Sequence, residues 1–257
     1  MDYACPRDGP MTEMNAPKTI LFFGAPGLVA WLGLTFAEPV LKTHGVPAII
    51  SWPFFIWAPV LVLFFLVISP YLKSGNITAF KERFWIRPVG KREWLIILAA
   101  FLLVQVLELL LQPTGGFLAK FGFFKPPPGI PDIFNPALDI SRGLKYLFGV
   151  EIKGAWWLIG FWAAWLLVNI VCEEVLWRGY ALPLQEQYFG KYAWLINGLS
   201  WNILFHFFMR WNVLALLPIS LMIPYLVQKY RNIWIGIIIH GTGNFLFFVI
   251  LVPEIIG

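Results

Sequence analysis

Cysteine and charged residues are scarce in this chain of 257 residues. The two cysteines, Cys5 and Cys172, are too few for a disulfide framework and too far apart for a CxxC metal knuckle. Charged residues make up only 13% of the sequence, and no basic run is interleaved with aromatic residues, which argues against nucleic-acid binding. The chain also lacks a GxxxxGK[ST] phosphate loop, a HExxH zinc motif and a GxSxG nucleophile motif. These absences exclude several common classes of soluble enzyme.

Hydrophobic residues are abundant instead, at 59% of the chain, and they come in long blocks rather than at amphipathic spacing. Blocks of this length predict membrane-spanning helices. We therefore predict an all-α polytopic transmembrane helical bundle of about seven spans, within a range of six to eight. The expected spans are Thr19–Phe36, Val46–Leu72, Trp94–Leu111, Ala155–Pro183, Tyr192–Met209, Asn212–Val227 and Ile233–Val252.

The basic residues indicate the orientation of this bundle. The short loop Lys73–Arg92 holds six of them, and by the positive-inside rule it faces the cytoplasm. Because successive spans cross the membrane in opposite directions, the amino terminus is then expected in the cytoplasm and Lys42 on the outer side. Lys191, Lys229 and Arg231 are expected on the cytoplasmic side. The carboxyl terminus is expected outside.

Four segments follow from these patterns. Residues 1–18 lack the basic start of a signal peptide, so we expect a short soluble tail. Residues 19–112 form accessory transmembrane helices, and residues 113–154 form a Pro-rich connection in which we expect a short helix over 136–148. Residues 155–257 hold the last four helices and most of the polar residues expected within spans.

The fourth span ends in charged residues, which are costly in a membrane and are usually kept for function. Glu174 and Arg178 are four residues apart, so they share a helix face and can form an ion pair. Glu173 is rotated by about 100° and faces a different groove. Asn169 and Trp177 lie four residues to either side of Glu173 and are expected on the same stripe. We therefore predict a structural Glu174–Arg178 pair and a functional Glu173.

Two later spans repeat a polar i, i+4 pattern. The fifth carries Asn202 and His206, and the seventh carries His240 and Asn244, the latter pair with two intervening glycines that allow a close approach. At about 1.5 Å per residue, Glu173 and His240 lie at similar depths and His206 lies deeper.

A carboxylate, two imidazoles and an amide that converge in a membrane cavity can hydrolyse an acyl bond. The carboxylate can act as a general base toward water, and imidazole and amide groups can donate to an oxyanion. No conventional nucleophile competes with this arrangement, because Ser200 has no GxSxG context and Cys172 has no basic neighbour in sequence.

These residues resemble three signature motifs of the CAAX protease and bacteriocin-processing family, which comprises the Rce1-like intramembrane glutamic proteases and the prokaryotic Abi proteins. The motifs are Glu173-Glu174-x-x-x-Arg178, His206 on the next helix, and His240-x-x-x-Asn244. The resemblance implies that Glu173 activates water with the help of His206. It further implies that His240 and Asn244 stabilise the oxyanion and that Glu174 and Arg178 support the site.

One position departs from the family pattern. The second motif usually has an aromatic residue four positions before its histidine, but here that position is Asn202, with Trp201 one residue earlier. We expect Asn169, Trp177 and Asn202 to line the substrate site. Glu108 and Gln105, on the third span, are interpreted as a helix contact.

The resemblance implies an intramembrane endopeptidase for a membrane-anchored protein or peptide, such as one with a prenylated CAAX terminus. It implies a catalytic water and no cofactor, partners limited to the substrate and the lipid bilayer, and location in the plasma membrane of a prokaryote or the endoplasmic reticulum of a eukaryote. Two alternatives stay open. One is a zinc site made by Glu173, His206 and His240. The other is a non-catalytic Abi-type immunity or regulatory protein.

Overall fold

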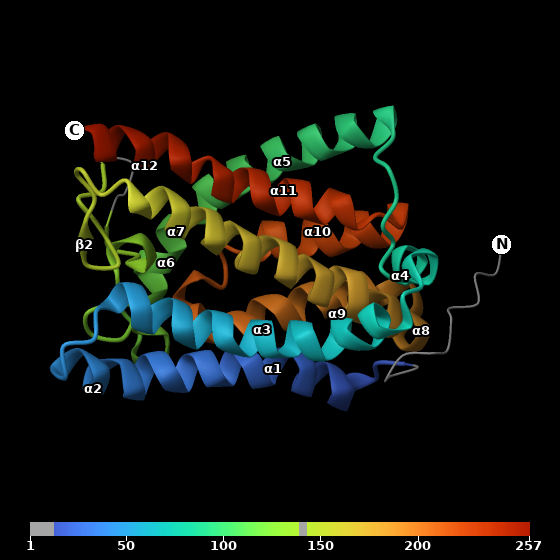
Figure 1. Ribbon diagram of the computed structural model, residues 1–257, viewed down its shortest axis with the longest axis horizontal. Helices are drawn as coiled ribbons and strands as arrows, with labels where there is room; N and C mark the ends of the chain where they lie inside the picture. The colour runs from blue at the N-terminus through green and yellow to red at the C-terminus, as the bar shows by residue number, and fades with distance from the viewer. Residues whose placement is uncertain (1–12, 139–142) are drawn as a thin grey trace.

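The computed structural model describes residues 13–138 and 143–257, which fold into a bundle of long helices (Figure 1). These described residues are 78% helical, and their strands are limited to the pair β1 (Tyr146–Leu147) and β2 (Val150–Glu151). The predicted all-α bundle is confirmed. The first twelve residues of the expected tail, including Cys5, lie outside the described part of the chain. The last part of the tail is packed, because Met14 is fully buried and its N–H donates to Leu184 O at 3.2 Å.

The first half of the chain forms three long helical rods and a short helix in the basic loop. Their bounds are α1 (Ala16–Leu32), the π-helical turn η1 (Gly33–Ala37), α2 (Glu38–Thr43), α3 (Ala48–Ser74), α4 (Ile77–Arg83) and α5 (Lys91–Leu111). A connecting segment follows, with α6 (Pro113–Leu118), the 3-10 turns η2 (Gly122–Phe124) and η3 (Asp132–Phe134), and the two strands.

The second half is helical with several irregular turns. It comprises α7 (Trp157–Leu166), the π-helical η5 (Leu167–Cys172) and η6 (Val175–Ala181), α8 (Leu182–Phe189), the 3-10 turn η7 (Gly190–Tyr192), α9 (Ala193–Leu199), the π-helical η8 (Ser200–Leu204), the 3-10 segment η9 (Phe205–Asn212), α10 (Leu217–Tyr230), α11 (Ile233–Phe245) and α12 (Phe247–Ile256).

Within residues 13–138 and 143–257, five helical stretches are long and apolar enough to cross a membrane: Ala16–Thr43, Ala48–Ser74, Lys91–Leu118, Trp157–Asn212 and Ile233–Ile256. The fourth folds back on itself at Gly190, whose positive φ of 56° ends α8, so it consists of two antiparallel legs. Large apolar side chains such as Leu21, Phe65 and Leu95 are exposed on the outer helices, where lipid can cover them. The chain is an integral, multi-pass membrane protein.

The predicted sidedness of the loops agrees with the bundle. Figure 1 shows α4 and α8 at one end, and α2, α6 and the strand pair at the other. At the first end the basic loop is tied to the second half, since the Arg83 guanidinium donates to Tyr180 O at 3.2 Å. Arg87 likewise donates to Arg231 O at 3.3 Å. Lys73–Arg92 and Arg231 therefore lie at the same end, as alternation of the spans requires.

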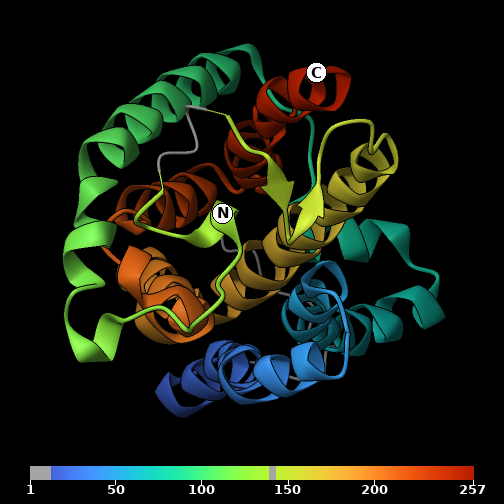
Figure 2. The same cartoon turned by 90° about the vertical axis from the view of Figure 1, so that its left-hand side faces the viewer.

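The connecting segment lies across the opposite end of the bundle (Figure 2). The helix expected over 136–148 is not found in the described part of that range, and residues 139–142 lie outside it. The chain instead turns after Asn135 and later enters β1, because Phe148 and Gly149, both at positive φ, form a tight turn between the two strands. The boundaries of the four predicted segments stay predictions.

Candidate active site

A cavity of about 350 Å³ lies between helices from both halves of the bundle. It receives five of the polar residues singled out in the sequence: Asn169, Glu173, His206, His240 and Asn244. They come from three segments that are far apart in the chain: η5 with the adjoining Glu173–Glu174 junction, η9, and α11. The structure therefore brings the fourth, fifth and seventh predicted spans together around one polar hollow.

Glu173 lies between the π-helical turns η5 and η6 and is only 3% exposed. Its Oε2 accepts hydrogen bonds from two indoles, Trp201 Nε1 at 2.9 Å and Trp177 Nε1 at 3.3 Å. No residue in the described ranges donates to its Oε1, which is left for a molecule in the cavity. Two fixed donors on one oxygen hold the carboxyl group in a single orientation.

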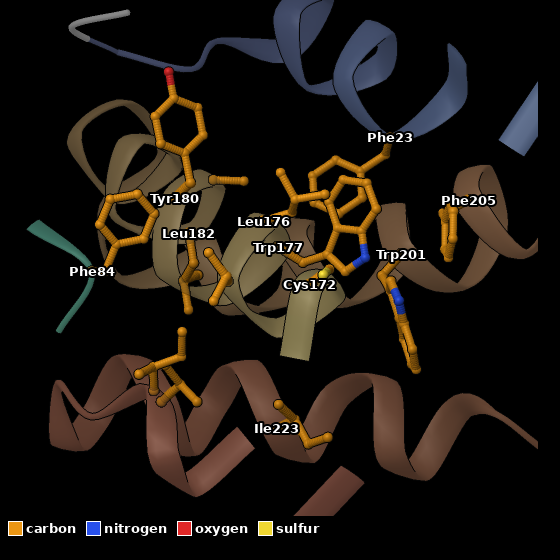
Figure 3. Close-up of a cluster of buried hydrophobic side chains, with 14 of the residues drawn as sticks. Phe23, Phe84, Cys172, Leu176, Trp177, Tyr180, Leu182, Trp201, Phe205 and Ile223 are labelled. Atoms are coloured by element: carbon orange, nitrogen blue, oxygen red, sulfur yellow. The ribbon is translucent and has the colours of Figure 1, made fainter. Parts of the chain in front are cut away.

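The two indoles are positioned by the hydrophobic core. Figure 3 shows Trp177 beside Phe23 of α1, with Trp201 close by. The rings of Trp177 and Phe23 are stacked at 4.6 Å between centroids, and both Trp177 and Phe23 are fully buried. α1 comes close enough for this contact because Gly27 packs directly on the backbone of η8 and η9, where a Cβ would clash with Leu204 O and Phe205 O. The accessory helix thus supports the carboxylate indirectly.

The unusual spacing of the second motif is explained by the backbone of η8. A π-helical turn holds one residue more than an α-helical turn, and such turns are frequent at functional sites. His206 Nδ1 contacts Trp201 O at 3.0 Å across five residues, and the two rings meet edge-to-face at 4.4 Å. In a regular helix, the residue four positions before a histidine lies beside it. Here Trp201, five positions before His206, occupies that place.

The position of His206 depends on a local kink. Its backbone (φ −82°, ψ 19°) departs from helical values, and so does that of Met209. Since a carbonyl oxygen only accepts, Nδ1 of His206 carries the proton that bonds Trp201 O, and Nε2 of the neutral ring keeps its lone pair. Counting residues along a straight helix places His206 deeper in the membrane than Glu173. With the kink, His206 lines the same cavity as Glu173.

Glu174 and Arg178 form the predicted ion pair, with Nη1 of Arg178 at 3.0 Å from Oε1 of Glu174 and both side chains fully buried. The same oxygen is 3.0 Å from His240 Nδ1. The guanidinium also lies over the Trp201 ring, 4.4 Å from its centroid. Glu174 has room between the helices because α11 carries Gly236, where a Cβ would clash with the carboxylate. The pair thus orients both His240 and Trp201.

Asn244 lies one turn after His240 on α11 and donates one amide N–H to His240 O at 3.2 Å. Its second N–H remains available to the cavity. Asn169 also lines the cavity, where the indole N–H groups of Trp165 and Trp57 approach its amide oxygen at 2.8 and 3.2 Å.

Two residues expected to line the substrate site are placed elsewhere. Trp177 lies behind Glu173 in the core, and Asn202 donates to Val213 O at 3.0 Å and to Ser220 Oγ at 3.4 Å, away from the cavity. The π-helical turn is the physical reason for the second difference, because it turns Trp201 toward the site and Asn202 away.

Sequence reasoning missed Trp201, Glu108 and Gln105 as cavity residues. The sequence signal for Trp201 is an aromatic residue five positions before His206, one position earlier than the family motif usually has it. The signal for Glu108 was a single carboxylate within a long apolar run, which was interpreted as a helix contact.

The connecting segment closes the outer end of the cavity. Ile133 and Phe134 of η3 line it, and Trp211 Nε1 donates to Phe134 O at 3.2 Å. Arg210 also donates to Phe123 O and to Lys125 O. The Pro-rich stretch is therefore attached to η9, the segment that carries His206.

No group of three His, Cys, Asp or Glu side chains within residues 13–138 and 143–257 is arranged to hold a metal ion. Glu173, His206 and His240 share the cavity without forming such a group.

The fold and the cavity define a polytopic helical membrane protein with a buried polar site. Residues 155–246 match the family model described as type II CAAX prenyl endopeptidase Rce1-like, and they form an Rce1-like domain of the CAAX protease and bacteriocin-processing family. No curated protein and no solved structure matches the chain. This match supports a CAAX-type protease kind of function, with a membrane-anchored substrate and a lipid bilayer environment.

Proposed function

We propose that this protein is an intramembrane glutamic endopeptidase that hydrolyses a peptide bond of a membrane-anchored substrate, near a terminus such as a prenylated CAAX tail. The observation that carries the proposal is the arrangement at Glu173. Its Oε2 is held by two indoles while its Oε1 is left for the cavity, which it shares with His206, His240 and Asn244.

Glu173 acts as the general base. Its free oxygen takes a proton from water as the water oxygen attacks the scissile carbonyl carbon. The neutral His206 ring, with its lone pair on Nε2, accepts a hydrogen bond from the same water and orients it. When the tetrahedral intermediate collapses, the C–N bond breaks and the leaving amine takes the proton back from Glu173. Peptide and water are thus converted into acid and amine.

Asn244 and His240 stabilise the oxyanion. The free amide N–H of Asn244 can donate directly. His240 already donates from Nδ1 to Glu174, so its Nε2 donates only when both ring nitrogens are protonated. Glu174 and Arg178 are positioning residues in this scheme, because they act through His240 and Trp201.

The decisive experiment replaces Glu173 by Gln in the full chain, reconstituted in vesicles and assayed with an internally quenched S-farnesyl CAAX peptide. Glu173→Gln keeps the size of the side chain and removes the base, so cleavage should fall by about 100- to 10,000-fold. Glu151→Gln removes an exposed carboxylate on β2 and should leave the rate unchanged.

Equal activity of Glu173→Gln and the unmodified protein would refute the glutamate mechanism. A family member that acts as a non-catalytic immunity or regulatory protein would show no cleavage in either form and would keep its phenotype in the variant. Activity that is lost to a chelator and restored by zinc would instead favour a metal mechanism, whereas we expect activity to persist in the chelator.

A further inference from the structure

The cavity contains a second carboxylate that the proposed mechanism does not use. Glu108 lies on α5, in a run from Trp94 to Leu111 in which Gln105 is the only other strongly polar residue. Both side chains line the cavity, and Gln105 Nε2 donates to Glu108 Oε2 at 3.3 Å. A carboxylate retained in such a helix, facing a cavity rather than lipid, indicates a binding function.

The pair lies beside the predicted oxyanion residues. α5 packs along α11, and a Cβ placed on Gly243 would be 3.6 Å from Gln105 Nε2. Gly243 directly precedes Asn244 and follows His240 by three residues. Because Gly243 has no side chain, the Gln105 amide lies close to the α11 backbone between the two positions. A substrate carbonyl held at Asn244 would therefore place a neighbouring substrate residue next to Glu108.

The charge of the cavity favours a cation at this point. Glu108 and Glu173 both line it, and no Lys or Arg of the described ranges does. Arg178, whose guanidinium lies over the Trp201 ring, is paired with Glu174. The cavity is also lined by aromatic rings, which bind ammonium and guanidinium groups through their faces. These rings are Phe134, Trp162, Trp165 and Phe247.

We propose that Glu108, held by Gln105, forms a subsite for a cationic substrate group, namely a lysine or arginine side chain close to the scissile bond. The subsite rests on the proposed function, because it assigns a substrate preference to the same cavity. Glu108 determines specificity and takes no part in the chemical step. A substrate with a carboxylate at this position is disfavoured by like charge.

The test uses S-farnesyl peptides in which a single lysine is moved through the three residues on either side of the anchored cysteine, with norleucine and glutamate replacing it in matched series. Values of kcat/KM are measured for the full chain in vesicles. One position should show a preference of about 10-fold or more for lysine over norleucine, mainly through KM. Glu108→Gln should abolish that preference, measured as the ratio of kcat/KM for the lysine and norleucine peptides, and Glu108→Lys should shift it toward glutamate. Glu151→Gln is the matched control.

Binding of the same peptides to Glu173→Gln, measured by fluorescence anisotropy, separates this inference from the proposed function. Lysine-selective binding that disappears in Glu173→Gln/Glu108→Gln supports the subsite even if no peptide is cleaved. Lysine selectivity that survives Glu108→Gln, an equal loss for all peptides, or no lysine-dependent difference in either measurement overturns it.

Discussion

Trp201 Nε1 donates a hydrogen bond of 2.9 Å to Oε2 of Glu173, and this contact joins two segments 28 residues apart. The same indole ring lies between the Arg178 guanidinium and the His206 ring. Trp201 is therefore the residue through which the ion pair, the proposed base and the histidine contact one another.

The first prediction concerns this hydrogen bond. Trp201→Phe keeps an aromatic ring and removes the donor to a carboxylate, an interaction worth about 1.5 to 3 kcal/mol. Cleavage should fall by about 10- to 100-fold in kcat, measured with the quenched peptide. Trp211→Phe is the control, since its indole donates to Phe134 O and not to Glu173. A loss as large in Trp211→Phe would show that the indole contact has no special role.

The π-helical turn leads to a second prediction. The exchange Trp201→Asn/Asn202→Trp restores the aromatic residue to the position usual in the family. Because the backbone turns position 201 and not 202 toward Glu173, the exchanged protein should be inactive. Asn202→Ala alone should retain activity within a few-fold and lose about 1 kcal/mol of stability with its hydrogen bonds. Activity in the exchanged protein would mean that the turn relaxes to a regular helix.

Asn244 provides a third prediction. Asn244→Ala removes a donor to the oxyanion, so kcat should fall by about 100- to 1000-fold while KM changes little. Thr242→Ala lies on the same helix and removes a hydroxyl that donates to Ile238 O. In single-turnover kinetics, Asn244→Ala should cleave the peptide much more slowly than Thr242→Ala. Similar rates for the two variants would show that Asn244 does not stabilise the oxyanion.

The buried ion pair gives a fourth prediction, on stability. Glu174→Gln leaves the fully buried Arg178 without its counter-charge, which typically costs about 3 to 5 kcal/mol. The double variant Glu174→Gln/Arg178→Met removes both charges and should be more stable than the single variant. Thermal unfolding in detergent measures the relative stabilities of the single variant, the double variant and the unmodified protein. Equal unfolding temperatures for the single variant and the unmodified protein would show that the ion pair does not contribute to stability.

Local patterns in the sequence determined the class of the protein and the identity of its main polar groups. Long apolar blocks predict membrane helices because a bilayer offers no partners for backbone polar groups, which a helix satisfies internally. A spacing of four residues places Glu174 next to Arg178 because such residues are neighbours on the surface of any helix. The polar residues of the three motifs could be selected in the same way, since polar side chains in membrane spans are few.

Tertiary structure alone decided which of these groups meet. The helix expected over 136–148 is not found in the described part of that range, and the connecting segment borders the cavity through contacts with η9 that no local pattern records. Trp201 and not Asn202 faces Glu173 because one extra residue is accommodated in a π-helical turn. Glu108 faces the cavity rather than a neighbouring helix because α5 packs against Gly243 of α11. These outcomes depend on packing between segments far apart in the chain, which residue spacing within one helix does not encode.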